Sequence, residues 1–435
     1  MDNITISIIL AVLMLLLLAS GFWVAMSLML VALVGVILYG SDVYGLIFAG
    51  TAWNSASSWS LVALPMFIWM GEILFRTRLS SDLFKGLTPW LTSLPGRLLH
   101  VNILSCGIFA AVSGSSAATA ATIGRMTLPE LKKRGYNERM SIATLAGSGT
   151  LGLLIPPSII LIVYGVAAEV SIARLFIAGA VPGLMLVLLF MLYTAIWSML
   201  NKADNAVEES QHYSWRERFV ALKYLLPVMG LIGFVLGSIY GGFATTTEAA
   251  AVGVTGALVL ALFSGSLNRE TFFSSLMGAV KTSCMIALIL IAAHFLTVAM
   301  AFLGIPRMLV GVLDAWSLTP FTLLLCLTVL FIILGCFLDG ISVVLLTTSI
   351  MLPMVSAAGI DLLWFGIYIV LVVEMAQITP PVGFNLFVLQ SLTGRNIFYV
   401  ARAALPFFLI IGLAIVLISF FPQIVTALPS QMTGR

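Results

Sequence analysis

Charge is scarce in this sequence, and its scarcity argues against a soluble globular protein. Only 9% of the 435 residues are Asp, Glu, Lys or Arg, whereas 61% are hydrophobic. A typical soluble domain carries roughly 25% charged residues. The mean hydropathy of +1.16 points the same way. We therefore expect an all-α polytopic membrane protein.

Cysteines and catalytic motifs are also sparse. The sequence has four cysteines, all in apolar stretches and without a C-x-x-C pair, so we expect buried free thiols and neither disulfides nor metal ligands: Cys106, Cys284, Cys326 and Cys336. There is no Walker A motif, no H-E-x-x-H and no G-x-S-x-G. These absences argue against an enzyme and against ATP-driven transport. Active transport would then draw on an ion gradient.

One stretch organises the chain, and it contains glycines and prolines within an apolar run. Residues 146–158 read AGSGTLGLLIPPS, in the middle of the apolar segment 142–168. Pro156 and Pro157 lack a backbone N–H, so a helix is expected to break here. A broken helix at membrane depth exposes carbonyl groups and helix ends that can bind ions. A proline kink with a packing role is the alternative.

The same pattern returns 224 residues later. Four of the 16 prolines have a partner at this offset: Pro129 with Pro353, Pro156 with Pro380, Pro157 with Pro381, and Pro182 with Pro406. Shared spacing of this kind indicates an internal repeat. We expect a first repeat at 1–200, a cytoplasmic linker at 201–223 and a second repeat at 224–435.

Each repeat is expected to hold five membrane spans of about 20 apolar residues. The first repeat gives spans near 4–20, 22–40, 46–75, 139–166 and 176–200, and the second gives 224–240, 244–264, 275–303, 362–390 and 403–422. The fourth span of each repeat, 139–166 and 362–390, is the discontinuous helix. The start of the chain lacks the basic n-region of a signal peptide, so no cleaved leader is expected.

Between the third and fourth spans of each repeat lies a stretch that does not fit a single crossing. These stretches are residues 98–131, with the tip Ser113-Gly114-Ser115-Ser116, and 320–354, with the tip Asp339-Gly340-Ile341-Ser342. A re-entrant hairpin that enters and leaves on one side is the economical interpretation. Two thin full spans are the alternative, but they need more apolar length than these runs provide.

The distribution of positive charge tests this layout. With the N-terminus outside, only Arg174, Arg307 and Arg435 of the 20 Lys and Arg residues fall outside. This is a strong positive-inside bias, and it favours a periplasmic N-terminus. Because five crossings per repeat is an odd number, the two repeats would insert in opposite orientations. The hairpin tips and the broken helices could then meet near the midplane, as in inverted-repeat transporters.

Several polar residues within the apolar segments could carry transport chemistry. The serines of the first tip offer hard oxygen ligands for an alkali cation or a carboxylate, although helix packing by small residues explains them equally well. Asp339 at the second tip is an intramembrane carboxylate, which could complete a sodium site or relay a proton, with Gln377 and Thr379 as neighbours. Glu374 could be a ligand or a structural group. Glu248 fits a capping box, and His294 and Glu72 fit structural roles.

At these residues the chain resembles a known family, the large membrane (M) subunit of tripartite ATP-independent periplasmic (TRAP) transporters, also called DctM-like. The stretches that carry the resemblance are SGSSAATA at 113–120, GLLIPPS at 152–158, ATTTEAAA at 244–251 and QITPPVG at 377–383. The resemblance covers nearly the whole chain. It implies two inverted repeats, an elevator-type motion, and sodium-driven uptake of an organic acid such as a C4-dicarboxylate or sialic acid across the bacterial inner membrane. The implied partners are a small four-helix membrane subunit, expected as a separate chain, and a periplasmic substrate-binding protein.

The resemblance also implies site residues. Two or more sodium ions would be held by Ser113, Gly114, Ser115, Gly149, Thr150, Asp339, Gly340, Gln377 and Thr379. The substrate would contact Ser115, Ser116, Thr150, Asp339 and Thr379. Pro156, Pro157, Pro380 and Pro381 would act as structural hinges.

Three other functions were weighed against this one. A stand-alone carrier or antiporter, coupled to protons or sodium, would use the same paired broken helices and would differ in needing no binding protein. A passive channel is disfavoured because no ring of charges or repeated filter occurs. An intramembrane enzyme is disfavoured because no nucleophile–base pair can be named.

Overall fold

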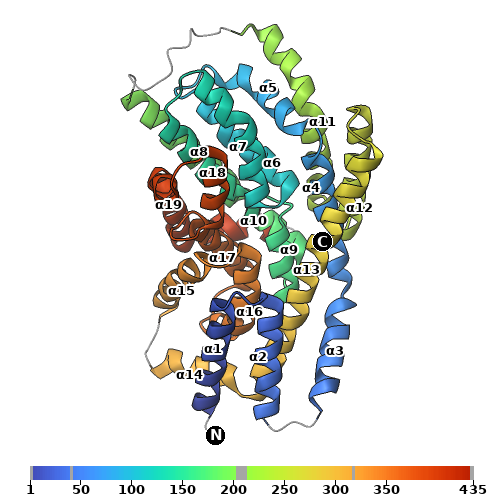
Figure 1. The fold of residues 1–435 in the computed structure, drawn as a ribbon, viewed down its shortest axis with the longest axis vertical. Helices are drawn as coiled ribbons and strands as arrows, with labels where there is room; N and C mark the ends of the chain where they lie inside the picture. The colour runs from blue at the N-terminus through green and yellow to red at the C-terminus, as the bar shows by residue number, and fades with distance from the viewer. Residues whose placement is uncertain (1–2, 40–42, 202–212, 316–318, 432–435) are drawn as a thin grey trace.

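The computed structural model describes residues 3–39, 43–201, 213–315 and 319–431, and the regular elements in these residues are all helices (Figure 1). The first half contains α1 (Asn3–Ala19), α2 (Val24–Leu38), α3 (Tyr44–Ala56), η1 (Trp59–Val62), α4 (Ala63–Phe75), α5 (Leu79–Leu91), α6 (Leu98–Ser113), α7 (Ser116–Lys133), α8 (Glu138–Thr150), η2 (Leu151–Leu153), α9 (Ile159–Ala167) and α10 (Ile172–Leu200). The second half contains α11 (Trp215–Tyr240), α12 (Thr246–Phe263), α13 (Arg269–Phe302), α14 (Ile305–Ala315), α15 (Pro320–Gly335), α16 (Gly340–Ala357), α17 (Leu362–Gln377), α18 (Phe384–Thr393), α19 (Ile397–Phe420) and α20 (Gln423–Gln431).

Five of these helices, α10, α11, α12, α13 and α19, are each long and apolar enough to cross a membrane. The prediction of an all-α polytopic membrane protein is therefore confirmed. Helix pairs also fall where hairpins and broken helices were predicted. A tip of two residues joins α6 to α7, and a tip of four joins α15 to α16. The breaks after η2 and after α17 contain the two proline pairs, each with a cis bond between its prolines.

Some predicted boundaries were wrong. The predicted third span, 46–75, corresponds to α3 and the η1–α4 segment, which meet at an angle of 54°. Residues 215–223 of the expected linker already belong to α11, and residues 202–212 lie outside the described part. The short helices α5 and α14 were not predicted. The inner face of α5 is formed by leucines at every fourth position, all of them buried: Leu79, Leu83, Leu87 and Leu91.

The four cysteines are free, as expected, but only two of them are buried. Cys106 and Cys336 are buried, whereas Cys284 on α13 and Cys326 on α15 are exposed. The mistake came from treating every apolar stretch as interior. In a membrane protein an apolar face can also point outward to lipid.

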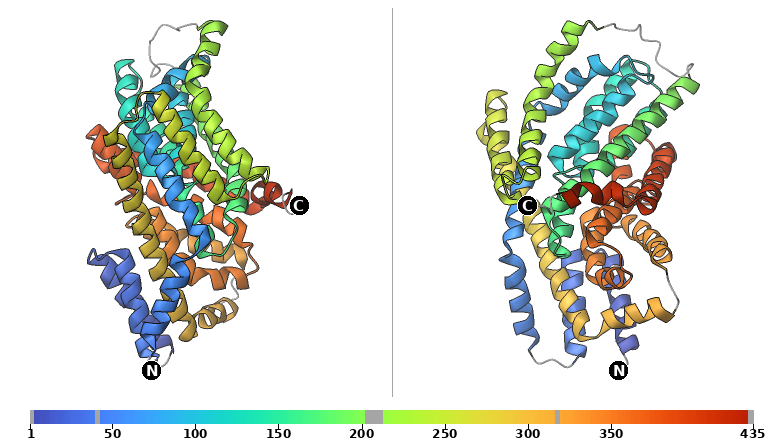
Figure 2. Two further views of the ribbon diagram at one scale, coloured as in Figure 1. Left: turned by 90° about the vertical axis from the view of Figure 1, so that its right-hand side faces the viewer. Right: turned by 180° about the vertical axis from the view of Figure 1, so that it is seen from behind.

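The helices form two groups, and each group mixes the two halves of the chain. In the first group, α13 packs along α2, α3 and α4, and α4 also packs against α12; α3 and α13 run side by side in Figure 2. In the second group, α8 contacts α6, α7 and α19, while α17 contacts α15, α16 and α19. The helices α8 and α17 are the centre of this second group, with every residue of Met140–Thr150 and Leu363–Gln377 buried.

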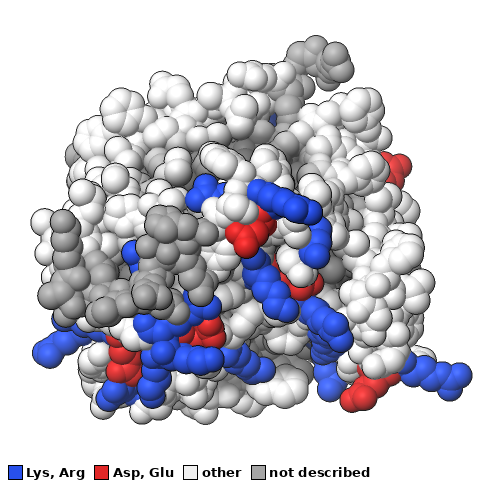
Figure 3. All heavy atoms as spheres, turned by 90° about the horizontal axis from the view of Figure 1, so that it is seen from above, with Lys and Arg blue, Asp and Glu red and all other residues white. Residues whose placement is uncertain are grey.

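Positive charge gathers at one end of the molecule. Figure 3 looks onto this end and shows Lys and Arg side chains across it. The N-terminus lies at the opposite end (Figure 1). The helices α5 and α14, each of which follows the third span of its half, also lie at opposite ends (Figure 1).

At the basic end, an exposed ion pair joins the two halves. Arg395 donates to the carboxylate of Glu138 from Nε at 3.0 Å and from Nη2 at 2.6 Å. Arg395 also holds the pKa of the Glu138 carboxyl below its usual value of 4.5. Both side chains are about half exposed, so screening by water keeps the contribution of the pair small.

This pair predicts a weak effect of mutation with a defined pH dependence. Glu138→Gln should lower the free energy of unfolding by less than about 1 kcal/mol at neutral pH. Because the folded-state pKa is depressed, the stabilisation is present above pH 4.5 and is lost as the pH falls below that value. Thermal unfolding of both proteins, from neutral pH down through 4.5, checks this. A difference that grows on acidification would contradict it.

Candidate functional site

The first hairpin tip is a compact set of serine oxygens. The helix α6 ends at Gly114, which adopts a left-handed conformation with φ +59°. Ser115 then caps α7 by accepting from the N–H of Ala118 at 3.5 Å. The Ser113 hydroxyl lies 2.8 Å from the Thr119 hydroxyl and accepts from the N–H of Ser115 at 3.3 Å. The predicted ligands Ser113, Gly114 and Ser115 are therefore adjacent and held in place locally.

This tip packs directly against the first broken helix. A Cβ added at Gly152 would lie only 2.5 Å from the carbonyl carbon and oxygen of Ser115. A Cβ at Gly114 would lie 3.1 Å from the backbone nitrogen of Ile159. Both contacts need glycine, since backbone atoms meet with no room for a side chain. Sequence reasoning did not select Gly152 as a site residue.

The second tip is built around Asp339. Its carboxylate caps α16 by accepting from the N–H of Ser342 at 3.3 Å and from the Ser342 hydroxyl. The tip lies against the second broken helix, because a Cβ on Gly340 would lie 2.7 Å from Nε2 of Gln377. On the other side of the tip, the Cys336 thiol is 3.5 Å from the carbonyl oxygen of Pro380.

Gln377 connects the two tips. Its amide oxygen accepts a hydrogen bond of 2.5 Å from the Ser116 hydroxyl, across 261 positions of sequence. Its amide nitrogen faces Gly340. Gln377 itself is 3% exposed and Ser116 is also 3% exposed. The structure therefore brings Ser116, Gln377 and Gly340 to one place between the halves.

Other predicted site residues lie at a helix end or in a break: Gly149 and Thr150 lie at the end of α8, and Thr379 lies in the second break, two residues after α17. The Thr150 hydroxyl donates to the carbonyl of Gly147 at 2.8 Å, and that of Thr379 donates to Met375 at 2.8 Å. Gly149 packs closely against Ala120 of α7. Helix α8 continues to Thr150 and a further turn, η2, follows, so the break begins only after Leu153. The glycines at the end of α8 thus permit close packing and do not themselves break the helix.

The first tip opens onto a cavity of about 210 Å³, which Ile341 beside the second tip also lines. One wall comes from the tips and the first break, and the other from α4 and α13. The lining includes Gly71, Glu72, Phe75, Ser113, Gly114, Ser115, Leu153, Ile159, Thr282 and Ile341. This cavity lies between the two groups of helices.

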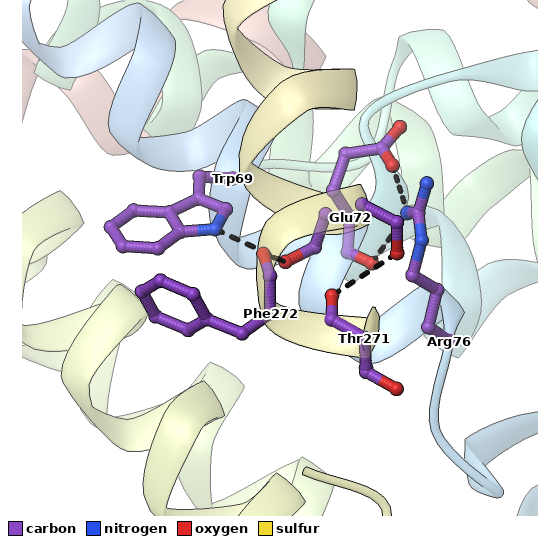
Figure 4. Close-up of polar contacts among 7 residues, drawn as sticks. Trp69, Glu72, Arg76, Thr271 and Phe272 are labelled. Atoms are coloured by element: carbon purple, nitrogen blue, oxygen red, sulfur yellow. Dashed lines mark hydrogen bonds and ion pairs between the residues drawn. The ribbon is translucent and has the colours of Figure 1, made fainter. Parts of the chain in front are cut away.

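The α4 wall carries an ion pair, drawn in Figure 4. Arg76 binds the Glu72 carboxylate, and it also donates to the Glu72 carbonyl at 3.0 Å. The pair lies against Gly278 of α13, where an added Cβ would be 2.6 Å from a carboxylate oxygen. One turn earlier, the Trp69 indole N–H donates to the Ser275 hydroxyl at 3.3 Å. Glu72 thus has a fixed partner on α4.

Two further candidates that the sequence assigned to structure, Glu248 and His294, have structural partners. Thr245 and Glu248 form the predicted capping box, with backbone-to-side-chain bonds of 2.8 and 3.2 Å. The His294 ring lies 2.7 Å from the Ser55 hydroxyl, joining α13 to α3. These hydrogen bonds give Glu248 and His294 structural roles that need no bound ligand.

Two buried polar side chains near the second break have no partner among the described residues. Glu374 and Asn385 are both 0% exposed, and none of their side-chain oxygen and nitrogen atoms makes a hydrogen bond there. The N–H of Leu154 faces the Glu374 carboxylate but donates to Leu151 at 3.1 Å. The sequence left the role of Glu374 open and missed Asn385, although its position in the first turn of α18, four residues after Pro381, was a usable signal. Unpaired buried polar groups are costly and mark this region for function.

The fold is that of a polytopic all-α membrane protein. Two solved transporter structures share the fold: YdaH of Alcanivorax borkumensis, at 17% identity and TM-score 0.56 over 88% of this chain and 89% of that one, and MtrF of Neisseria gonorrhoeae, at 13% identity and TM-score 0.51 over 88% and 83%.

The family follows from sequence. The model of the tripartite ATP-independent periplasmic transporter, DctM component, matches residues 11–424, and the chain belongs to that family. The resemblance noted from the motifs is thereby confirmed. Members of this family are transporter permease subunits and not enzymes.

Named relatives handle different substrates. The C4-dicarboxylate large permease DctM of Pseudomonas aeruginosa is 31% identical over 87% of this chain and 88% of its own. The sialic acid large permease SiaM of Vibrio cholerae is 30% identical over 96% and 97%. The isethionate permease DctMQ of Oleidesulfovibrio alaskensis is 32% identical over 96% of this chain, which spans 65% of that longer protein.

Proposed function

We propose that the chain is the membrane core of a sodium-driven importer of an organic acid. A periplasmic binding protein would deliver the substrate, and a small four-helix membrane subunit would complete the complex. The observation that carries the proposal is that the first tip meets both breaks, through Ser115 with Gly152 and Ser116 with Gln377, while the second tip meets Gln377 through Gly340. Relatives named for dicarboxylate and sialic acid support an acidic substrate.

The two halves are proposed to be inverted repeats in the bacterial inner membrane, with the N-terminus in the periplasm. The gathering of Lys and Arg at the end opposite the N-terminus supports this orientation. The opposite placement of α5 and α14 supports the inversion. The paired prolines support the repeat, since Pro129 and Pro353 lie in α7 and α16, and Pro182 and Pro406 lie in α10 and α19.

The tips offer the oxygen ligands that sodium needs. Sodium is a hard cation, suited to hydroxyl, carbonyl and carboxylate oxygens. The first site would use Ser113, Gly114 and Ser115 with Gly149 and Thr150 from α8. The second would use Asp339, Gly340, Gln377 and Thr379. Bound sodium supplies positive charge that offsets the charge of an organic acid.

The chain's own residues would bind and enclose the substrate. Ser115, Ser116, Thr150, Asp339 and Thr379 would surround it between the tips. The close packing of Gly152 on Ser115 leaves no space for water between tip and break. The group of helices around α8 and α17 would then move as an elevator against the group around α4 and α13, with the cavity of about 210 Å³ at the boundary. The proline pairs would keep the breaks open as hinges.

Thermal unfolding in sodium chloride against choline chloride, at equal ionic strength, tests the proposal. A ligand that binds only the folded state stabilises it by about 2.7 kcal/mol at a hundredfold excess over its Kd. We expect a rise in midpoint in sodium that is lost in Thr150→Val. The matched control is Thr127→Val, whose hydroxyl is likewise buried and bonded to its own helix, at 2.9 Å from the carbonyl of Ile123.

The absence of any sodium effect would overturn sodium coupling. The alternative would then be a proton-coupled carrier that works without a binding protein, and pH-dependent uptake by the purified chain in vesicles would distinguish it. An equal loss in both threonine variants would contradict the assignment of Thr150.

A further inference from the structure

A second cavity, of about 460 Å³, lies at the basic end between α7, α8 and α18. It is separate from the tips: none of the residues that line it lines the cavity there. The lining comprises Gly124, Arg125, Leu128, Pro129, Lys132, Tyr136, Glu138, Ser141, Ile142, Leu392 and Thr393. Gly124 allows the three helices to converge, since an added Cβ would lie 2.6 Å from Leu145 and 2.8 Å from Leu392.

Two cations line the cavity together with the Glu138 carboxylate, whose pKa is lowered mainly by Arg395 and also by the charge of Lys132. Arg125 and Lys132 lie two turns apart on α7, so they share one face of that helix. Neither makes an ion pair in the described part of the chain. The nearby carboxylates are already used, because Glu138 binds Arg395 and Glu130 binds Arg134 at 2.7 Å. The cavity therefore carries an excess of positive charge.

The rest of the lining is apolar or already hydrogen-bonded. Leu128, Ile142 and Leu392 supply hydrocarbon walls. The Ser141 hydroxyl donates to the carbonyl of Asn137 at 2.9 Å, and the Thr393 hydroxyl donates to Leu389 at 2.7 Å. A ligand would therefore be held mainly by charge at the rim and by apolar contact inside. Basic pockets between membrane helices accept phosphate head groups in this way.

We propose that this cavity binds a phosphate-bearing anion through Arg125 and Lys132. The head group of an anionic phospholipid and a free phosphate share this chemistry. An occupant would contact α7 from the first half of the chain and α18 from the second, so binding would stabilise the contact between halves. The inference does not depend on the ion or substrate that the protein transports.

The test titrates the purified full chain with phosphatidylglycerol in mixed micelles and follows the midpoint of thermal unfolding. Phosphatidylcholine is the neutral comparison, and inorganic phosphate against chloride at equal ionic strength tests the soluble source. The key variant is the double substitution Arg125→Gln, Lys132→Gln. The matched control is Lys133→Gln, Arg402→Gln, which removes the same charge from two exposed residues that do not line the cavity.

We expect phosphatidylglycerol to raise the midpoint, with apparent affinity about 30-fold lower in the cavity variant and unchanged in the control. A shift with inorganic phosphate alone, lost in the cavity variant, would assign the site to a soluble anion. The proposal is overturned if neither anion shifts the midpoint. It is also overturned if the cavity variant and the control respond alike, because the attraction would then be general to the basic end.

Discussion

Replacing Gly152 with alanine should abolish substrate uptake, although it adds a single methyl group. The new Cβ would lie 2.5 Å from the carbonyl of Ser115 and 2.7 Å from the nitrogen of Ser116. These are backbone atoms, so no rotamer change can relieve the clash, and the first tip must move away from the break. Misplacement of a site by about 1 Å costs about 100-fold in rate, and we expect at least that loss of uptake.

The control for this experiment is Gly412→Ala on α19. There an added Cβ would meet only the sulfur of Met375, at 3.7 Å, which is ordinary contact. Uptake in proteoliposomes should be retained in this variant. Overpacking at Gly152 also lowers the stability, by roughly 1–3 kcal/mol, so a cooperative unfolding transition must be shown for both proteins. Wild-type uptake by Gly152→Ala would mean that the contact between tip and break is not needed for transport.

Local signals in the sequence located the framework of the site. A proline pair interrupts a helix, and a capping Ser or Asp favours the start of a new one, as Ser115 and Asp339 do at the two tips. These signals depend only on residues that are close together in the chain. For this reason the helices end and restart at Gly114, at Asp339 and at the proline pairs, where the tips and breaks were predicted. The bend before α4 also has a local signal, Pro65 in the first turn of that helix.

Contacts between distant segments could not be obtained in this way. The hydrogen bond from Ser116 to Gln377 spans 261 positions, and the contact of Gly152 with Ser115 depends on how α6, α7 and η2 pack. From the sequence, Gln377 could be predicted to lie near the second tip. Its contacts with Ser116 of the first tip and Gly340 of the second could not be predicted. Similarly, only packing reveals that Asn385 is buried without a partner. The sequence therefore supplied the candidate ligands, and the fold supplied their neighbours.

Asp339→Asn should abolish sodium-dependent uptake while leaving the protein folded. Asparagine caps helices as well as aspartate does, so it can still accept from the N–H of Ser342 and keep the start of α16 in place. What the substitution removes is the negative charge at the second tip. An interaction with a charged group contributes about 1.5–3 kcal/mol. Sodium affinity should therefore fall about 10-fold to 100-fold.

Asp361→Asn provides the matched control, because Asp361 also caps a helix. It accepts from the N–H of Trp364 at 3.0 Å at the start of α17 and lies on the exposed surface. The same loss of charge and the same type of cap are thus tested away from the tips. We expect both variants to unfold near the wild-type temperature in choline, and only Asp339→Asn to lose the rise in midpoint in sodium. If Asp339→Asn keeps both the rise in midpoint and its uptake, Asp339 is only a helix cap. The negative charge that attracts sodium must then come from another group. The carboxylate of Glu374, which has no hydrogen-bond partner among the described residues, is a buried candidate.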